Sequence, residues 1–229
     1  MQTAQAFALD LGGERALLDP AGIAYFVAPR MLVVADLHLE KGASFARRRM
    51  FLPPYDTTAT LARLAALVAK YDPKVIVSLG DGFHDDQASD SLEASAVRAI
   101  EALAAGRTMV WVTGNHDPSP PRNVPGEAAS SLTLGALTFR HIAEPGHDGA
   151  EVSGHYHPAA IARGRGKSVR RSCFACDGTR LVMPAFGAYA GGLNVRDRAF
   201  SGLFRPAALL AYMQGVDRIF PIAARDLIG

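Results

Sequence analysis

Short apolar runs alternate with longer amphipathic stretches in the first half of the chain. Residues 32–35, 74–79 and 109–112 consist mainly of β-branched or large apolar side chains, which predicts buried strands. Residues 57–71 and 91–105 place apolar side chains on one helical face, which predicts two helices. This order of strand, helix, strand, helix and strand predicts a parallel sheet flanked by helices.

Polar side chains stand where both predicted helices begin. Asp56 or Thr57 is placed to cap the first helix. Asp90 is placed to cap the second helix, and Glu93 follows it at the spacing of a capping box. Each helix is therefore expected to have a side-chain acceptor for its free backbone N–H groups.

The second half of the chain has a different pattern. Residues 137–139, 151–153, 180–183 and 199–204 are short strand candidates separated by glycine-rich turns. This half is therefore predicted to be mainly β. Because no internal repeat or domain linker interrupts the sequence, residues 1–229 are predicted to form a single domain.

The overall composition is that of an ordinary globular protein, with 49% hydrophobic and 20% charged residues. A formal net charge of +2 does not indicate a nucleic-acid partner and does not exclude one, because a local basic patch can be balanced elsewhere. No signal peptide and no stretch of roughly 20 apolar residues is visible, so a cytoplasmic protein without a membrane partner is expected. Cys173 and Cys176 are expected to be reduced thiols, because a structural zinc site normally has about four ligands.

Residues of metal-ligand type follow the predicted strands. An Asp-x-His motif comes after residues 32–35, a Gly-Asp motif after 74–79 and a Gly-Asn-His-Asp motif after 109–112. Because open α/β sheets form their sites past the carboxyl ends of the strands, these side chains are expected to converge. One such motif is weak evidence, but most of the 7 histidines fall into this ordered set. The predicted site contains Asp36, His38, Asp81, Asn115, His116, His141, His155 and His157.

These side chains offer a mixed set of oxygen and nitrogen donors. Carboxylates, an amide oxygen and several imidazoles suit Mn²⁺, Fe or Zn²⁺, and the imidazoles make the set poor for Ca²⁺ or Mg²⁺. The ligands are too many for one tetrahedral ion, and they suit two ions about 3.5–4 Å apart that share a bridging carboxylate. Two divalent metal ions are therefore expected as cofactors.

Taken in order, the motifs resemble the signature of the calcineurin-like metallophosphoesterases. They are Asp36-x-His38, Gly80-Asp81, Gly114-Asn115-His116-Asp117, His141 and Gly154-His155-x-His157, within residues 31–158. The resemblance implies an α/β fold, a four-layer α/β/β/α sandwich of two mixed β-sheets. It also implies that Asp36, His38 and His157 hold one metal ion, that Asn115, His141 and His155 hold the other, and that Asp81 bridges them.

The resemblance implies that His116 is not a ligand but faces the scissile phosphate. There it would protonate the leaving oxygen or stabilise the transition state while a water shared by the two ions attacks in line. Asp117 either orients this imidazole or caps the following turn, and both interpretations stay open. His84 is predicted to contact the phosphate or a metal ligand; the alternative is a surface histidine beside Asp85 and Asp86.

A narrower resemblance covers nearly the whole chain. Residues 36–42, 80–85, 184–187 and 191–194 are similar to those of the bacterial ligase-associated DNA damage response metallophosphoesterases. This resemblance implies a manganese-dependent endonuclease that prefers single-stranded DNA and acts in DNA repair. It also implies a functional association with a DNA ligase and a helicase.

Cationic and aromatic side chains flank the predicted site in the sequence. A substrate strand would need positive charge along its phosphates and flat side chains beneath its bases. The alternative is that the charged runs are solvated faces and the aromatic side chains belong to the core. The candidate substrate-binding residues are Arg47, Arg48 and Arg49, with a second run of Arg163, Arg165, Lys167, Arg170 and Arg171, and with Phe45, Phe51 and Tyr55 as stacking surfaces.

Other functions compete with the nuclease interpretation. The same chemistry could act on a small substrate, such as a nucleotide or a lipid-linked diphosphate, or on a phosphoprotein. A catalytically inactive scaffold is disfavoured, because the chain lacks none of the ligands and keeps the general acid His116. Cleavage of a polymer, compared with that of a nucleotide, separates these alternatives.

Overall fold

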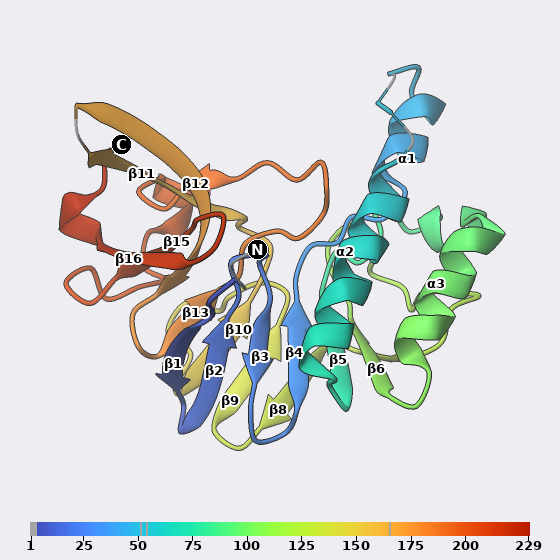
Figure 1. The fold of residues 1–229 in the computed structure, drawn as a ribbon, viewed down its shortest axis with the longest axis horizontal. Helices are drawn as coiled ribbons and strands as arrows, with labels where there is room; N and C mark the ends of the chain where they lie inside the picture. The colour runs from blue at the N-terminus through green and yellow to red at the C-terminus, as the bar shows by residue number, and fades with distance from the viewer. Residues whose placement is uncertain (1–3, 51, 54, 165) are drawn as a thin grey trace.

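The computed structural model describes residues 4–229 except residues 51, 54 and 165. Within this part of the chain two mixed β-sheets pack face to face, and two helices cover the outer face of the first sheet (Figure 1). The predicted α/β fold class with two mixed sheets is therefore confirmed. The helices are α1 (Lys41–Arg47), which projects beyond one end of the sheets, and the two covering helices α2 (Asp56–Tyr71) and α3 (Ala94–Ala104).

The first sheet joins an antiparallel half to a parallel half. Its strands follow one another in sequence order, and pairing is antiparallel up to the fourth strand and parallel from there on. The three strands predicted in the first half of the chain all lie in the parallel part. The strands are β1 (Phe7–Leu11), β2 (Glu14–Leu18), β3 (Ala24–Phe26), β4 (Met31–Val34), β5 (Val75–Leu79), β6 (Thr108–Val112) and β7 (Glu127–Ala129).

The second sheet has a short parallel centre between antiparallel flanks. β9, β10 and β13 are parallel neighbours, and a long hairpin of β11 and β12 extends from one side of them. Three of the four strands predicted for this half are present. The strands are β8 (Ser131–Leu134), β9 (Leu137–Arg140), β10 (Ala150–Ser153), β11 (Pro158–Gly164), β12 (Lys167–Cys176), β13 (Arg180–Val182), β14 (Leu193–Asn194), β15 (Leu210–Gln214) and β16 (Ile219–Ala223).

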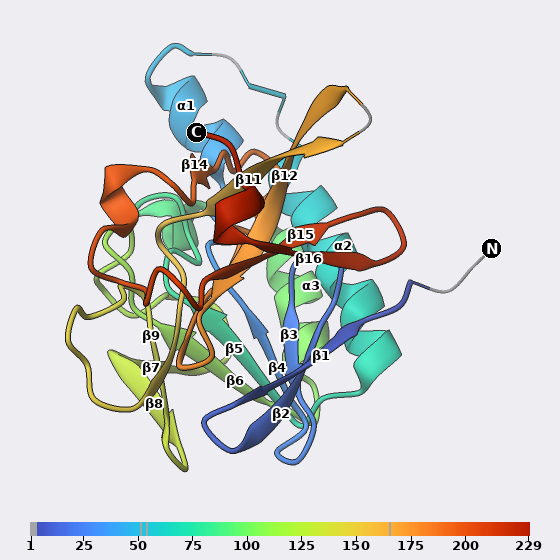
Figure 2. The ribbon, with the colours of Figure 1, turned by 90° about the vertical axis from the view of Figure 1, so that its left-hand side faces the viewer.

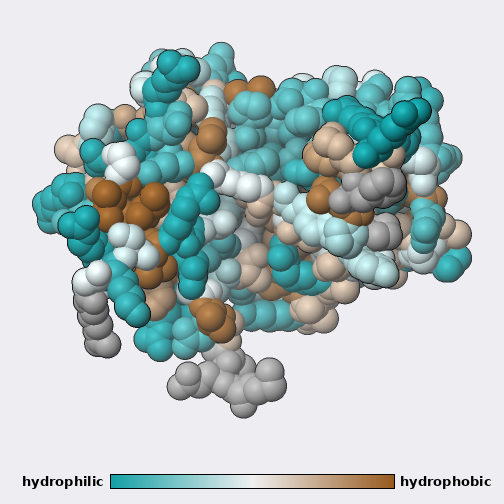
Figure 3. All heavy atoms as spheres, turned by 90° about the horizontal axis from the view of Figure 1, so that it is seen from above, coloured by the Kyte–Doolittle hydropathy of each residue, from teal (hydrophilic) through white to brown (hydrophobic). Residues whose placement is uncertain are grey.

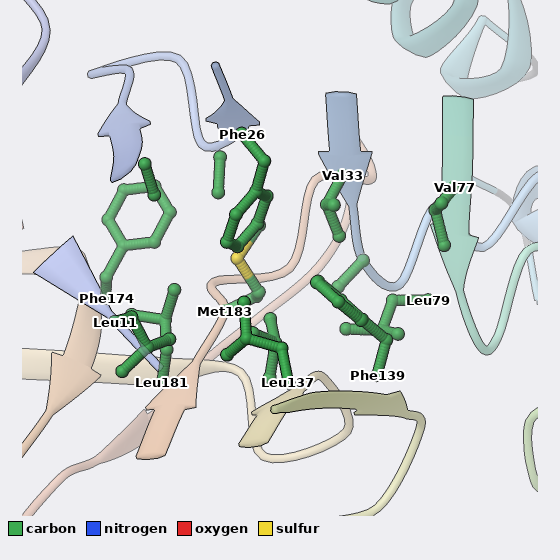
Figure 4. Packing of buried hydrophobic residues seen from close by; sticks show 14 of the residues in the cluster. Leu11, Phe26, Val33, Val77, Leu79, Leu137, Phe139, Phe174, Leu181 and Met183 are labelled. Atoms are coloured by element: carbon green, nitrogen blue, oxygen red, sulfur yellow. The ribbon is translucent and has the colours of Figure 1, made fainter. Parts of the chain in front are cut away.

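The main hydrophobic core lies between the two sheets. Successive residues of a strand point to opposite faces, so Val33 of β4 and Val77 of β5 face the second sheet, whereas Leu32 faces α2. Figure 4 shows Val33 and Val77 on one side of this core and Phe139 of β9 on the other. Phe139 packs edge to face against Phe26, with ring centroids 5.2 Å apart. This packing fixes the second sheet against the first and brings their loops to a common edge.

The polar residues at the start of α2 do not cap it, so that prediction was wrong. The carboxylate of Asp56 accepts a hydrogen bond from the backbone N–H of Gly42 at 3.1 Å. The hydroxyl of Thr57 accepts one from the backbone N–H of Glu40 at 2.8 Å. Both side chains therefore hold the segment that leads into α1 instead of satisfying their own helix.

The start of α3 also differs from the prediction. Asp90 lies in a separate short 3-10 helix, η1 (Ala88–Ser91), and the extended backbone of Leu92 separates η1 from α3. Glu93 occupies the cap position, and no side chain caps the helix there. The predicted cap at Asp90 was therefore wrong, because the chain turns once more before α3 begins.

Short turns cover the outer face of the second sheet. Within the described residues this layer contains the 3-10 helices η2 (Arg198–Phe200) and η3 (Ala224–Asp226) and no α-helix. The strand predicted at 199–204 was wrong. Gly202 has a φ of 79°, which turns the backbone while Phe200 remains buried against the sheet.

Two other expectations concern the cysteines and the membrane. Cys173 and Cys176 are unpaired, buried thiols in β12, and burial raises the pKa of Cys176 to about 11. The thiols are therefore held in the neutral, unreactive form.

Among the described helices, none has the length and apolar character needed to cross a membrane.

Candidate metal centre

The predicted ligands meet at one edge of the two sheets. In the first sheet Asp36, Asp81 and Asn115 follow β4, β5 and β6, and in the second His141 and His155 follow β9 and β10. This edge is at the top of Figures 1 and 2, where α1 and the β11–β12 hairpin rise above it. Figure 3 looks down on the edge and shows hydrophilic side chains over α1 on one side and around the hairpin on the other.

The first ligand cluster consists of Asp36, His38 and His157. Their ligand atoms all lie within 4.8 Å of one another. The Nε2 atom of His157 is 3.3 Å from a carboxylate oxygen of Asp36 and 3.4 Å from Nε2 of His38. Two of these ligands come from the first sheet and one from the second, so the cluster exists only where the sheets meet.

The second ligand cluster consists of Asp81, His141 and His155, again within 4.8 Å of one another. The Nε2 atom of His141 is 3.4 Å from the Asp81 carboxylate and 3.0 Å from the side-chain oxygen of Asn115, which joins this cluster. The Nδ1 atom of His141 lies 3.3 Å from the carbonyl oxygen of Leu79. Such a bond to a backbone carbonyl fixes the ring and turns Nε2 toward the site.

Asp81 lies between the two clusters. Its Oδ2 atom is 3.4 Å from Nε2 of His141 and 4.0 Å from Nε2 of His38. Its Oδ1 atom accepts a hydrogen bond from the backbone N–H of His116 at 2.9 Å. One carboxylate thus faces a histidine of each cluster, which is the geometry a bridging ligand needs.

Glycines make room for these ligands. A Cβ atom on Gly80 would come within 2.1 Å of the His141 ring, and one on Gly114 within 2.1 Å of the Asp81 carboxylate. Neither side chain can move away without leaving its cluster. The glycines of the Gly-Asp and Gly-Asn-His-Asp motifs are therefore required for close approach and not merely for turns.

The backbone is strained at the ligands themselves. Residues other than glycine seldom adopt a positive φ, and such strain concentrates at functional sites. Here it recurs at five residues of the two clusters. The φ values are 52° for Asp36, 44° for His38, 45° for Asp81, 67° for His155 and 45° for His157.

The two clusters differ in protonation. Burial lowers the pKa of His38 to about 3, against the opposing charge of Asp81. Burial would also lower the pKa of His141, but the hydrogen bond to Asp81 and the charges of Asp36 and Asp81 outweigh it and raise that pKa. Burial would raise the pKa of Asp81, but the hydrogen bond and charge of His141, the backbone N–H of His116 and the charge of His38 together outweigh it and lower the pKa to about 2. His38 is therefore a neutral ligand, whereas His141 and Asp81 each favour the charged form of the other.

These observations fit a pair of divalent metal ions. The Nε2 atoms of His38 and His157 lie 3.4 Å apart and face the carboxylates of Asp81 and Asp36, so several donor atoms converge where an ion would bind. Carboxylate, amide and imidazole donors within a few ångströms are the ligands of divalent transition metals. The first cluster, and the second cluster with Asn115, can each hold one ion, and Asp81 of the second cluster also faces the first.

His116 stands at the rim of the site. Its Nδ1 atom lies 3.1 Å from the carbonyl oxygen of His84, so this nitrogen is the donor and Nε2 remains for other partners. The His116 ring stacks on that of His84, with centroids 5.4 Å apart, and lies 5.3 Å from that of His38. Burial lowers the pKa of His84 to about 4. His84 is therefore a neutral ring that packs against His116.

Asp117 contacts backbone instead of the His116 ring. Its carboxylate accepts hydrogen bonds at 3.0 Å from the backbone N–H groups of Gly114 and Phe83. Burial raises the pKa of Asp117 to about 6. Among the described contacts Asp117 thus ties the loop after β5 to the loop after β6, which carry Asp81 and His116 respectively.

The candidate substrate-binding arginines lie at the end of α1. Arg47 forms an ion pair with Asp85 at 2.5 Å, whereas Arg48 and Arg49 are exposed. The described cations of the second basic run lie on the β11–β12 hairpin. Phe51 and Arg165, which were also predicted to contribute, lie outside the described residues.

Lys41 and the segment 184–194 also contribute to the site, although neither was among the predicted site residues. The backbone N–H groups of Gly187 and Leu193 donate to the carbonyl oxygens of Asp36 and His157 at 3.0 Å. The ammonium group of Lys41 donates to the carbonyl oxygen of Tyr189 in this segment at 3.1 Å. The sequence feature that could have revealed this segment is its glycine-rich composition, because glycines let the backbone pass close to the first cluster.

Comparisons with known proteins agree with this geometry. A family model described as calcineurin-like phosphoesterase matches residues 29–172. The crystal structure of Pseudomonas putida nuclease MPE is similar at 25% identity and a TM-score of 0.71, covering 95% of this chain and all (100%) of that chain. Yfce, a phosphoesterase from E. coli, is 16% identical with a TM-score of 0.41 and covers 85% of this chain and 98% of its own. A search of curated proteins finds no match.

Proposed function

This chain belongs to the calcineurin-like phosphoesterase family and is a metal-dependent phosphoesterase; from that premise we propose that it cuts single-stranded DNA internally. The observation that carries the proposal is the pair of ligand clusters joined by Asp81, with His116 at their rim. Two ions held by these clusters would suit in-line displacement at a phosphodiester. A nucleic-acid substrate is supported by the similarity to a nuclease over 95% of this chain.

The ligand clusters, His116 and Asp117 have different roles in the proposed reaction. Two divalent ions held by the clusters would offset the charge of the scissile phosphate and acidify the attacking water. His116, with its Nδ1–H bound to the His84 carbonyl, would carry a second proton on Nε2 and transfer it to the leaving oxygen. Asp117 keeps the loops that carry Asp81 and His116 at a fixed distance.

Manganese is the proposed metal, with iron or zinc as alternatives, because the imidazole-rich donor set suits these ions. The exposed side chains of Arg48 and Arg49 at the end of α1 support an anionic polymer as the substrate. A role in DNA repair, an association with a DNA ligase and a helicase, and a cytoplasmic location stay predictions from the sequence.

The test is nicking of a circular single-stranded DNA by protein that has been stripped of metal and then given Mn²⁺. Conversion of the circle to a linear form identifies an endonuclease, because an exonuclease needs an end. His116→Ala should lower the rate by about 10²–10⁴-fold. The matched control is His147→Ala, which removes a histidine from the loop between β9 and β10, away from both clusters.

Each of three negative results is informative. An intact circle, together with hydrolysis of bis(4-nitrophenyl) phosphate, would keep the chemistry and assign a small-molecule substrate. Loss of neither activity in His116→Ala would remove this residue from the mechanism. No hydrolysis of either substrate would revive the inactive scaffold.

A further inference from the structure

Lys41 is fixed beside the metal centre by contacts on both sides. The residue before it, Glu40, is held by Thr57, and the residue after it, Gly42, is held by Asp56. These two bonds to the start of α2 set the direction in which α1 leaves the site. The position of the Lys41 side chain therefore follows from the anchoring of its neighbours.

The ammonium group of Lys41 is only partly satisfied. One of its three N–H donors is used by the carbonyl oxygen of Tyr189 at 3.1 Å. No carboxylate of the described residues forms an ion pair with it. Burial lowers the pKa of Lys41, against the attraction of Asp56, so the charge is partly desolvated without a partner. An anionic group that approaches the site would supply that partner.

A row of side chains connects Lys41 to the reaction centre. The ammonium group is 5.9 Å from the ring centroid of Phe45, and Phe45 is 5.5 Å from His84. The His84 ring is in turn 5.6 Å from His38 and 5.4 Å from His116. Lys41 and Phe45 therefore lie on the side of the metal centre where His116 meets the leaving group.

We propose that Lys41 and Phe45 form a subsite for the nucleotide that adjoins the scissile phosphate on the leaving-group side. The Lys41 ammonium binds the next phosphate along the strand, and the half-buried Phe45 ring packs against the base or sugar. This subsite rests on the proposed nuclease function and adds a preference for substrates with more than one phosphate. A substrate with a single phosphodiester can fill the metal centre but not the subsite.

The test compares a thymidine dinucleotide, which has one phosphate, with a thymidine tetranucleotide, which has three linking phosphates. In Lys41→Ala, kcat/KM for the tetranucleotide should fall at least about tenfold more than kcat/KM for the dinucleotide, mainly through KM. Lys41→Arg should restore most of this difference, because it keeps the charge. Phe45→Ala should act in the same direction with a smaller change. The matched control is Lys74→Ala, which removes an exposed cation at the opposite end of β5.

Equal losses on both substrates would overturn the subsite. That result, with a lower manganese content per chain, would assign Lys41 to anchoring the segment 184–194 through Tyr189. A tetranucleotide that is cut no faster than the dinucleotide by the unaltered protein would also overturn it.

A binding measurement separates this proposal from the nuclease proposal. Fluorescein-labelled oligothymidylate is titrated with His116→Ala and with His116→Ala/Lys41→Ala at several salt concentrations. Loss of one phosphate contact should flatten the slope of log K against log salt by about 0.7. An unchanged slope overturns the subsite even if the circle is cut, whereas a flatter slope supports it even if cleavage is slow.

Discussion

The two ligand clusters contain the same kinds of side chain but differ in how their charges are balanced. In the second cluster His141 bonds to Asp81, to Asn115 and to the Leu79 carbonyl, so its polar atoms have partners without an ion. In the first cluster His38 is neutral, and its Nδ1 atom has no partner among the described residues. Ligand identity therefore does not determine how far a cluster depends on its metal; the surrounding hydrogen bonds do.

The largest expected effect comes from the residue the clusters share. Asp81→Asn should lower kcat for bis(4-nitrophenyl) phosphate by about 10³-fold or more, because a neutral amide cannot balance two divalent ions. The metal content, measured by elemental analysis, should fall below two ions per chain. A variant that retains both ions and a near-normal rate would show that Asp81 is not the bridge.

The next prediction contrasts one histidine from each cluster in metal-free protein. His141→Leu should lower the free energy of unfolding by about 3 kcal/mol, because it leaves the Asp81 carboxylate buried and unpaired. His38→Leu should change it by less than about 1 kcal/mol, because it removes a nitrogen that already lacks a partner. Urea unfolding in the presence of a chelator measures both values. Equal losses of unfolding free energy in the two variants would show that the clusters do not differ in how their side chains are stabilised without metal.

A smaller effect is expected at Asp117, which joins the loop of Asp81 to the loop of His116 through two backbone N–H groups. Asp117→Asn retains one acceptor oxygen but places an NH₂ group against a backbone N–H, so we expect a loss of about 1–2 kcal/mol in the same unfolding assay. The hydrolysis rate should fall by less than in Asp81→Asn. A rate loss as large as that of Asp81→Asn would give Asp117 a direct part in the chemistry.

The last prediction is a dependence of stability on pH that has opposite signs at His84 and His141. The pKa of His84 is lowered to about 4 in the folded protein, so its contribution to stability is present above the ordinary value of about 6.5 and is lost as the pH falls toward 4. His84→Gln should therefore gain thermal stability relative to the parent protein between pH 6.5 and 4. The pKa of His141 is raised, so its contribution is present at low pH and is lost as the pH rises. Melting temperatures without metal, taken across this range, test both signs.

The strands that carry ligands from the first sheet could be predicted from the sequence, because they are buried on both faces and read as continuous apolar runs. β4, β5 and β6 are of this kind. The ligand motifs could be predicted for a related reason: each stands directly after such a strand, so the fold class fixes which side chains can meet. The pairing of ligands into clusters needed the second sheet, whose placement depends on packing around Phe139 and not on local pattern.

Other parts of the fold gave weaker signals. β1 and β2 are joined at Gly12-Gly13, a hairpin signal that the alternation in Phe7–Leu11 could have reinforced. The outer part of β12 is exposed and rich in cations, so it has no apolar pattern to follow. Asp56 was predicted to cap α2, but it binds the backbone N–H of Gly42 at the start of α1. The sequence alone does not distinguish a residue that caps its own helix from one that binds a neighbouring segment.

The turn between β10 and β11 supplies His157 to the first cluster and His155 to the second. A growing polypeptide that has emerged only as far as β10 can complete neither cluster, although it already contains Asp36, His38 and Asp81. Phosphoesterase chemistry therefore requires the second sheet to have docked on the first, and contacts so distant in sequence form slowly. The return of hydrolysis during refolding would mark the moment at which the two sheets have docked.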